Sequence, residues 1–140
     1  MKQLLAAGLA VVVAAVAAPQ AVGAPATGHH TAVGTKRGDG HSVLEAKSQY
    51  VYTHMTSTGH DVGCNSSCLR FWPRVTSSAS PRAIDGVRQR RLRTTPGHQV
   101  TYYGHKLYYF SHDSATLPIG RGITSYGAKW RLITVTGRAG

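Results

Sequence analysis

Apolar and polar residues alternate along several short stretches of the chain, a pattern typical of β-strands. From residue 42 onward, helix-forming runs are sparse, Gly and Pro interrupt the sequence often, and Val, Ile, Thr, Tyr and Trp supply most of the apolar content. The clearest pair of stretches is 99–103 and 107–110, joined by Gly104-His105-Lys106, which predicts a hairpin. These features predict an all-β domain of antiparallel strands.

The strand pattern occurs twice, at an offset of 58 residues. The matches include Tyr50 with Tyr108, Tyr52 with Phe110, His54 with His112 and Trp72 with Trp130. Both tryptophans of the chain lie in register, which favours duplication over chance. We therefore expect two pseudo-equivalent antiparallel units, about 42–76 and 99–136, each a hairpin followed by a closing strand (71–75 and 130–136). Half of a chain this short would be marginal alone, so the units should share one small core.

Aromatic side chains dominate one face of the expected strands, because every second residue of a strand points the same way. We interpret this face as core; an exposed aromatic platform that binds a ligand is the alternative. The matched histidines, His54 and His112, favour a shared structural role over metal binding or proton transfer. The residues expected in the core are Tyr50, Tyr52, Trp72, Tyr108, Phe110 and Trp130.

The second unit contains a short motif, Tyr-x-Phe-x-x-Asp, formed by Tyr108, Phe110 and Asp113. With 99–104 before it, Trp130 after it and the Cys64-to-Pro73 segment in the first unit, this run resembles a bacterial secreted repeat family of unknown function. Its members are predicted lipoproteins with a Tyr-x-(Phe/Trp/Tyr)-x-x-Asp motif. The resemblance spans about 42–137 and implies an extracytoplasmic two-copy β domain with no established activity. The first unit departs from the motif, with Met55 in place of the Asp.

Asp113 has two interpretations from the sequence itself. It ends a strand and precedes Ser114-Ala115-Thr116, where a carboxylate can accept hydrogen bonds from backbone amides just ahead in a turn. A role as a catalytic acid or metal ligand is the less favoured alternative, because the other unit lacks the carboxylate.

The N-terminus has the layout of a secretory signal peptide. Lys2 precedes an uncharged apolar run over 4–18, and small residues lead to Ala24 and Ala26. We predict a signal peptide over 1–26, an exported mature protein and no transmembrane segment in the mature chain, because the run is short of the roughly 20 residues that span a bilayer. The polar segment 27–41 is predicted to be a flexible tether, which leaves 42–140 as the secreted β-repeat domain.

Cys64 and Cys68 are the only two cysteines. In an exported protein their short spacing and the turn-forming residues between them favour a disulfide. A redox-active pair, or a metal site helped by the nearby His60 and Asp61, are the alternatives.

The chain carries 16 Lys and Arg against five Asp and Glu, a net charge of +11. The basic residues cluster between the two units, at Arg82, Arg88, Arg90, Arg91 and Arg93. Such a cluster attracts polyanions, and outside a membrane these are envelope polymers or lipid headgroups rather than nucleic acid. A merely solvated basic linker is the alternative.

No recognised catalytic, nucleotide-binding or nucleic-acid-binding motif occurs in the sequence. We therefore expect no enzymatic activity, no cofactor and no specific nucleic acid partner. The prediction is an exported, non-catalytic β-repeat protein that associates with the cell envelope through a basic surface. A small extracytoplasmic redox- or metal-linked protein using the Cys64/Cys68 region, with His60 or His112, is the alternative.

Overall fold

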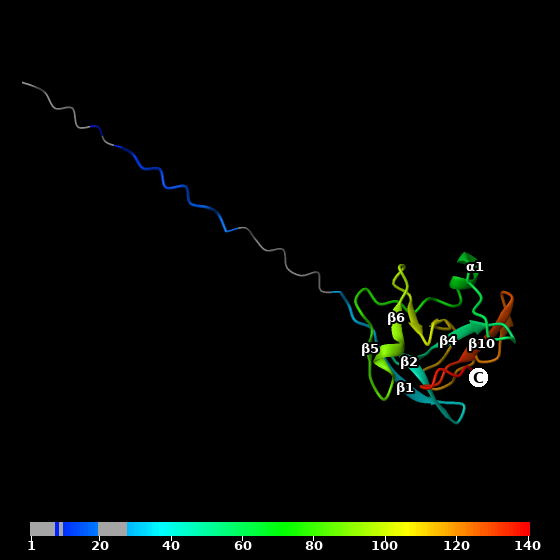
Figure 1. Ribbon diagram of the computed structural model, residues 1–140. Helices are drawn as coiled ribbons and strands as arrows, with labels where there is room; N and C mark the ends of the chain where they lie inside the picture. Colours follow the sequence, from blue (N-terminus) through cyan, green and yellow to red (C-terminus); the bar gives the residue numbers. More distant parts are fainter. Residues whose placement is uncertain (1–7, 9, 20–27) are drawn as a thin grey trace, which may run out of the picture.

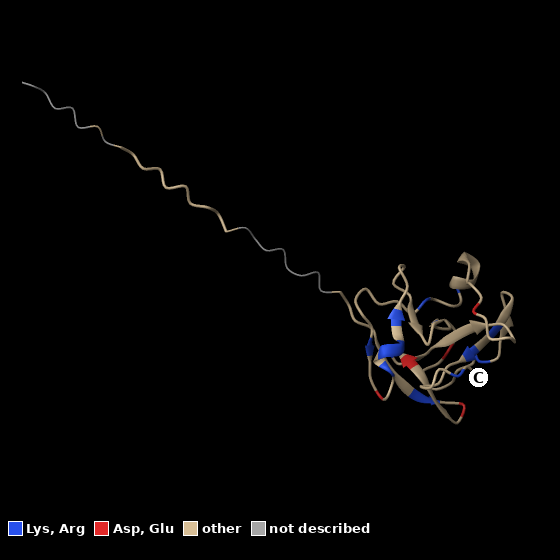
Figure 2. Cartoon of the chain, in the orientation of Figure 1, with Lys and Arg blue, Asp and Glu red and all other residues tan. Residues whose placement is uncertain are grey.

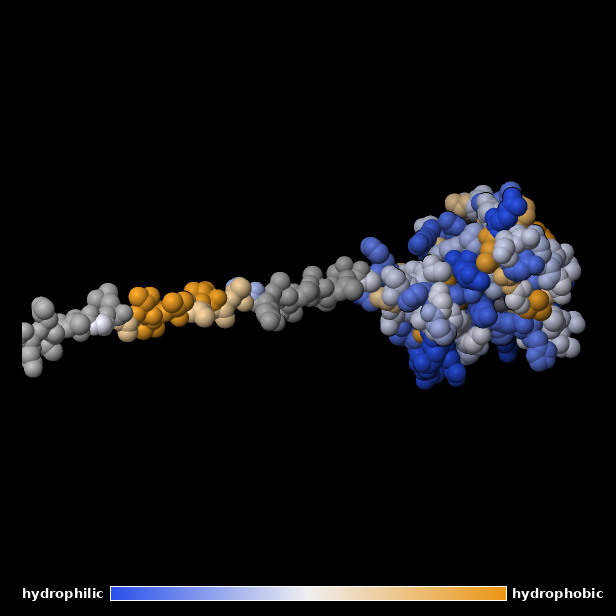
Figure 3. All heavy atoms as spheres, turned by 90° about the horizontal axis from the view of Figure 1, so that it is seen from above, coloured by the Kyte–Doolittle hydropathy of each residue, from blue (hydrophilic) through white to orange (hydrophobic). Residues whose placement is uncertain are grey.

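The computed structural model describes residues 8, 10–19 and 28–140 (Figure 1). The predicted signal peptide, 1–26, lies largely outside the described residues. Residues 10–19 are exposed and belong to no helix or strand, and most of them appear as a hydrophobic stretch in Figure 3. Among the residues that the structure describes, no helix is both long and apolar enough to cross a membrane.

The all-β prediction is confirmed. Within the described part, the chain forms three small sheets, with strand orders β3-β2-β1-β5, β4-β10-β9 and β6-β7-β8, and two helices of one turn each. In chain order the elements are β1 (Ala32–Gly38), β2 (His41–Ala46), β3 (Gln49–Tyr50), β4 (Tyr52–Met55), α1 (Ser66–Leu69), β5 (Arg82–Ala83), the 3-10 helix η1 (Gln89–Arg91), β6 (Leu92–Thr94), β7 (Val100–Tyr102), β8 (His105–Lys106), β9 (Thr124–Ser125) and β10 (Ala128–Leu132).

Four tight hairpins organise these sheets. Each has a two-residue turn in which both residues have positive φ, the conformation that suits the twist of paired strands. The turns join β1 to β2, β2 to β3, β7 to β8 and β9 to β10, and their residues are Asp39-Gly40, Lys47-Ser48, Tyr103-Gly104 and Tyr126-Gly127. The predicted hairpin over 99–110 therefore exists, but it turns one residue earlier than expected.

Five of the six aromatic residues predicted for the core are buried, and Phe110 is partly buried. Within this core, four rings form a stack. Trp72 and Trp130 lie face to face, with ring centroids 3.8 Å apart. Phe110 stacks on the outer face of Trp72 at 4.2 Å, and His54 on the outer face of Trp130 at 4.0 Å. Both tryptophans are buried, so their rings do not form an exposed binding platform.

A second core cluster lies on the opposite side of the same strands. Leu107 and Val51 are fully buried there, whereas their neighbours Tyr108 and Tyr52 face the ring stack. Alternate residues of each strand therefore enter different clusters, as the period of two requires. The core thus has two layers, with apolar packing on both sides of the central strands.

The contacts of the two halves correspond, but at a different register from the predicted one. Tyr52 and Tyr108 exchange backbone hydrogen bonds of 2.8 and 2.9 Å, and each makes an edge-on ring contact, with Trp72 and Trp130 respectively. Tyr52 therefore corresponds to Tyr108, an offset of 56, whereas Trp72 corresponds to Trp130, an offset of 58. The predicted pairings of Tyr50 with Tyr108, Tyr52 with Phe110 and His54 with His112 are wrong by two positions.

The predicted tether is also wrong over its described part. Residues 32–38 form β1, which pairs with β2 over residues 33–38 and with β5 over residues 32–33, and Val33 has no exposed surface. Gly38 allows the close packing, because a Cβ there would lie 2.8 Å from the Tyr50 ring and 2.9 Å from Val43. Residues 32–38 are therefore held against the core by backbone hydrogen bonds and by side chains of neighbouring strands that pack over their glycines.

The closing strands are shorter than predicted. Over 71–75 the chain forms only an isolated bridge at Arg74, followed by another at Thr76, and β10 ends at Leu132. Even so, Val75 and Ile133 make equivalent backbone hydrogen bonds in the two halves. Their carbonyls accept hydrogen bonds from Val100 and Leu44, at 2.7 and 2.8 Å.

Candidate functional site

The five predicted polyanion-binding arginines lie along one exposed edge of the fold. Figure 2 shows Lys and Arg positions, in blue, on β5, η1 and β6, which are neighbours at this edge. Both β5 and β6 are outermost strands of their sheets. We call this surface, formed by Arg82, Arg88, Arg90, Arg91 and Arg93, the arginine edge; all five residues are exposed.

The arginine edge is held by specific contacts to the core. The Gln89 side chain accepts a hydrogen bond from the Ala83 amide at 2.8 Å and donates one to the Pro81 carbonyl at 2.9 Å, which ties η1 to β5. The Arg88 amide donates to the buried Tyr102 hydroxyl at 3.2 Å. The Arg91 guanidinium lies over the Tyr103 ring, 4.8 Å from its centroid. These contacts fix the backbone of the segment while its guanidinium groups face solvent.

The charge of this edge is not compensated by ion pairs. Across residues 28–140, the two ion pairs of the structure join His105 to Asp61 and Arg121 to Asp39, and neither involves the arginine edge. Leu92 is buried between Arg91 and Arg93, so strand alternation directs both flanking arginines outward. The result is a row of like charges that can take up a polyanion.

The residues of the Tyr-x-Phe-x-x-Asp motif have structural partners. Tyr108 is buried and Phe110 ends the ring stack. The Asp113 carboxylate accepts a 2.6 Å hydrogen bond from the Tyr52 hydroxyl and a 3.1 Å bond from the Gly120 amide. Burial raises the pKa of Asp113 above its usual range, against the lowering effects of these hydrogen bonds. Burial and the Asp113 carboxylate also raise the pKa of the Tyr52 hydroxyl.

The predicted disulfide between Cys64 and Cys68 is present, with the two Cα atoms 5.3 Å apart. Cys68 lies in the short helix α1 and is buried against the ring stack cluster. The Asn65 side chain caps this helix by accepting a 3.0 Å hydrogen bond from the Cys68 amide. The cross-link therefore braces the turn that leads into Trp72.

The histidines do not behave as a matched pair. His54 is buried, and its Nε2 and Nδ1 atoms lie 2.8 and 3.2 Å from the carbonyl oxygens of Ser125 and Val62, whereas His112 is exposed. The two histidines therefore occupy different surroundings, although His112 also contacts the rings of Phe110 and Phe71.

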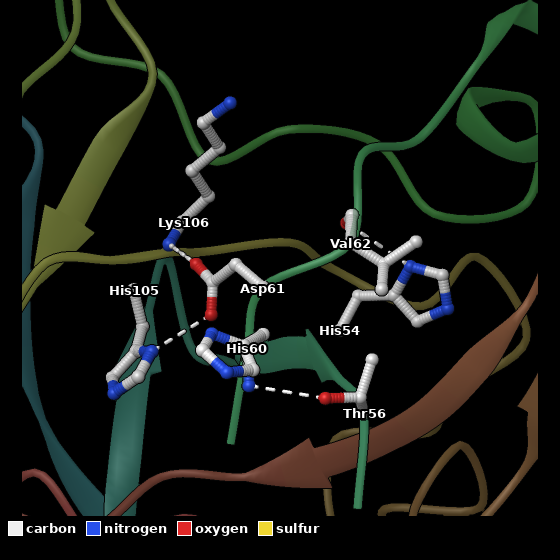
Figure 4. Close-up of polar contacts among 7 residues, drawn as sticks. All are labelled: His54, Thr56, His60, Asp61, Val62, His105 and Lys106. Carbon is white, nitrogen blue, oxygen red and sulfur yellow. Dashed lines mark hydrogen bonds and ion pairs between the residues drawn. The ribbon is translucent and has the colours of Figure 1, made fainter. Parts of the chain in front are cut away.

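A histidine–aspartate pair that was not predicted from the sequence joins strand β8 to the segment that follows β4 (Figure 4). The Asp61 carboxylate accepts hydrogen bonds from His105 Nδ1 at 2.8 Å and from the Lys106 amide at 3.0 Å. His60 is exposed, and its amide donates to Thr56 Oγ1 at 3.1 Å. Among the described residues, no group of three or more His, Cys, Asp or Glu side chains is placed to hold a metal ion.

The structure also forms a groove that sequence reasoning missed. It lies between the β1–β2 turn, residues 37–40, and the loop 116–121, and it has a volume of about 520 Å³. Arg121 lines the groove and pairs with Asp39 at 2.7 Å. The signal in the sequence was the apolar run Leu117-Pro118-Ile119 inside an otherwise polar loop.

Comparisons with models of known protein families, with curated proteins and with solved structures give no match.

Proposed function

We propose that the protein is an exported, non-catalytic binding protein that attaches to phosphate-bearing polymers of the cell envelope through the arginine edge. The observation that supports this most is the convergence of five exposed arginines on one edge, where none of them forms an ion pair with a carboxylate of the described residues. The signal-peptide pattern supports the extracytoplasmic location, where such polymers are the abundant polyanions.

Arginine suits this task better than lysine. Its planar guanidinium presents five N–H donors and can bind a phosphate through two parallel hydrogen bonds. The edge presents its charges at intervals along η1 and β6, so a linear polyanion can engage several of them at once. Each exposed contact contributes about 1 kcal/mol at an anionic surface, which means that retention must be collective.

An explanation without a partner must be separated from this proposal. Charged residues on an outermost strand prevent its open backbone from pairing with another molecule, and β6 is such a strand. If protection were the only role, replacing the arginines would promote self-association and leave polymer binding unchanged. The two roles therefore predict different measurements.

The test is a quadruple variant, Arg88→Gln, Arg90→Gln, Arg91→Gln and Arg93→Gln. Binding to long-chain polyphosphate should weaken by up to about a thousandfold, the loss of four contacts of about 1 kcal/mol each, and the dependence on salt should become shallower. A second arm with vesicles of anionic phospholipid distinguishes a polymer from lipid headgroups as the source of the phosphate.

A matched control removes the same charge elsewhere. Lys47, Arg70, Arg74 and Lys129 are also exposed, so changing all four to Gln lowers the net charge equally. The control should keep most of its affinity. Equal losses in the two variants would show that net charge, rather than the arginine edge, drives binding, and unchanged affinity in the arginine variant would refute the proposal.

A further inference from the structure

The groove between the β1–β2 turn and the loop 116–121 is held open by contacts at both ends of the loop. Lys36 Nζ donates hydrogen bonds to the carbonyl oxygens of Ala115 and Ser48, at 2.5 and 2.8 Å. Further along, the Gly120 amide donates to Asp113 at 3.1 Å. The Leu117 amide donates to Ser114 Oγ at 3.0 Å. The loop is therefore fixed in shape, as small-molecule sites usually are.

The loop nonetheless exposes large apolar side chains. Leu117 and Ile119 retain 59% and 47% of their accessible surface, and both line the groove. Because the loop is fixed by hydrogen bonds on either side of them, their exposure is a property of its folded shape. The groove volume of about 520 Å³ lies within the roughly 300–1,000 Å³ typical of small-molecule sites.

The polar rim of the groove is mainly cationic. Arg37 and Arg121 line it, and Asp39 is its one acidic residue. Asp39 lies 2.7 Å from the Arg121 guanidinium, and both side chains are about half exposed. One carboxylate cannot occupy all five donors of a guanidinium, so Arg121 can still bind an anion that enters the groove.

We propose that this groove binds a single-chain amphiphile with an anionic head group, carboxylate or phosphate. The head group contacts Arg121 and Arg37, and the chain lies against Leu117 and Ile119. This site is separate from the arginine edge and does not depend on the function proposed above. Asp39 acts as an internal competitor, because its carboxylate holds Arg121 while the groove is empty.

The experiment measures binding of dodecanoate below its micellar concentration by isothermal titration calorimetry. Arg121→Gln should weaken binding about tenfold, and the double variant Leu117→Ser with Ile119→Ser should do the same. Asp39→Asn should strengthen it severalfold, because the competing carboxylate is gone. Both Arg121→Gln and Asp39→Asn break the same ion pair, so effects in the same direction would indicate a structural disturbance and overturn the proposal.

Three controls complete the test. Acetate shares only the head group of dodecanoate, and dodecyl maltoside shares only its chain. If acetate bound comparably, the groove would be a simple anion site, and if dodecyl maltoside bound comparably, it would be a simple apolar site; either result would overturn the proposal. Arg93→Gln lies on the arginine edge and should leave dodecanoate binding unchanged. A loss there would mean that dodecanoate binds the arginine edge, and the groove assignment would fail while polymer binding remained a separate measurement.

Discussion

The disulfide allows the sharpest test of how the structure is stabilised. The variant Cys64→Ala removes the cross-link and leaves the buried Cys68 side chain in its core position. The two residues are four positions apart, and closing so small a loop restricts the unfolded chain by about 2 kcal/mol. For a domain of this size, that loss lowers the melting temperature by about 8 °C.

The assay is thermal unfolding followed by near-ultraviolet circular dichroism, which reports the stacked tryptophans Trp72 and Trp130. At 25 °C the signal should be unchanged in Cys64→Ala, because Asn65 still caps α1. The parent protein with reductant should unfold at the same temperature as the variant. An unchanged melting temperature would show that the cross-link is not present in the folded protein. Loss of the aromatic signal at 25 °C would show that the fold depends on it.

Two further predictions concern the core. Burial raises the pKa of Asp113 above its usual value near 3.8, so the folded state binds the Asp113 proton more tightly than the unfolded state. The stability that this proton contributes is lost as pH rises from about 4 through the folded pKa. Urea unfolding should therefore show a smaller decline in the free energy of unfolding over this range for Asp113→Asn than for the parent, and identical pH profiles of the two proteins would refute this prediction. Gly38→Ala should lower the free energy of unfolding by about 1–3 kcal/mol, because the new methyl group would lie 2.8 Å from Tyr50 and 2.9 Å from Val43. Gly63 has open space around it, so Gly63→Ala should leave the free energy of unfolding unchanged in the same measurement.

The fold class and the core were predictable because they rest on composition and local spacing. Alternating aromatic residues such as Tyr108 and Phe110 indicate a strand whatever its partners are. The Cys64–Cys68 pair is close in sequence, so no knowledge of the fold was needed to predict its closure. Both features are encoded within a few residues of each other.

The first strand was missed because its composition is that of a loop. The segment 32–38 has one buried valine, and its two glycines are buried because other side chains pack over them. A signal was nevertheless present, since Asp39-Gly40 is among the strongest short hairpin turns. The Asp39-Gly40 turn by itself predicts that the segments 32–38 and 41–46 pair as a hairpin.

The register error has a related cause. Twenty positions separate Tyr52 from Trp72, and twenty-two separate Tyr108 from Trp130. A gapless alignment that matches both tryptophans therefore places the strands of one unit two residues out of register with those of the other. Because side chains alternate with a period of two, this shift keeps every side chain on the same face of its strand, and the error is not apparent from the pattern. The hydrogen bonds between Tyr52 and Tyr108, together with their matching ring contacts to Trp72 and Trp130, reveal the true correspondence. The groove and the Asp61–His105 pair were missed for a different reason, because residues distant in sequence form both.

The pairing of the two halves separates the residues that fold the chain from those available for binding. β4 of the first half pairs with β10 of the second, and Tyr108 of the second bridges to Arg74 of the first. The ring stack likewise alternates between halves, so neither half can bury its aromatic residues alone. The arginine edge and the groove lie outside this shared core, on exposed side chains. Substitutions there should therefore alter binding with little effect on stability, which is what makes both proposals testable in the folded protein.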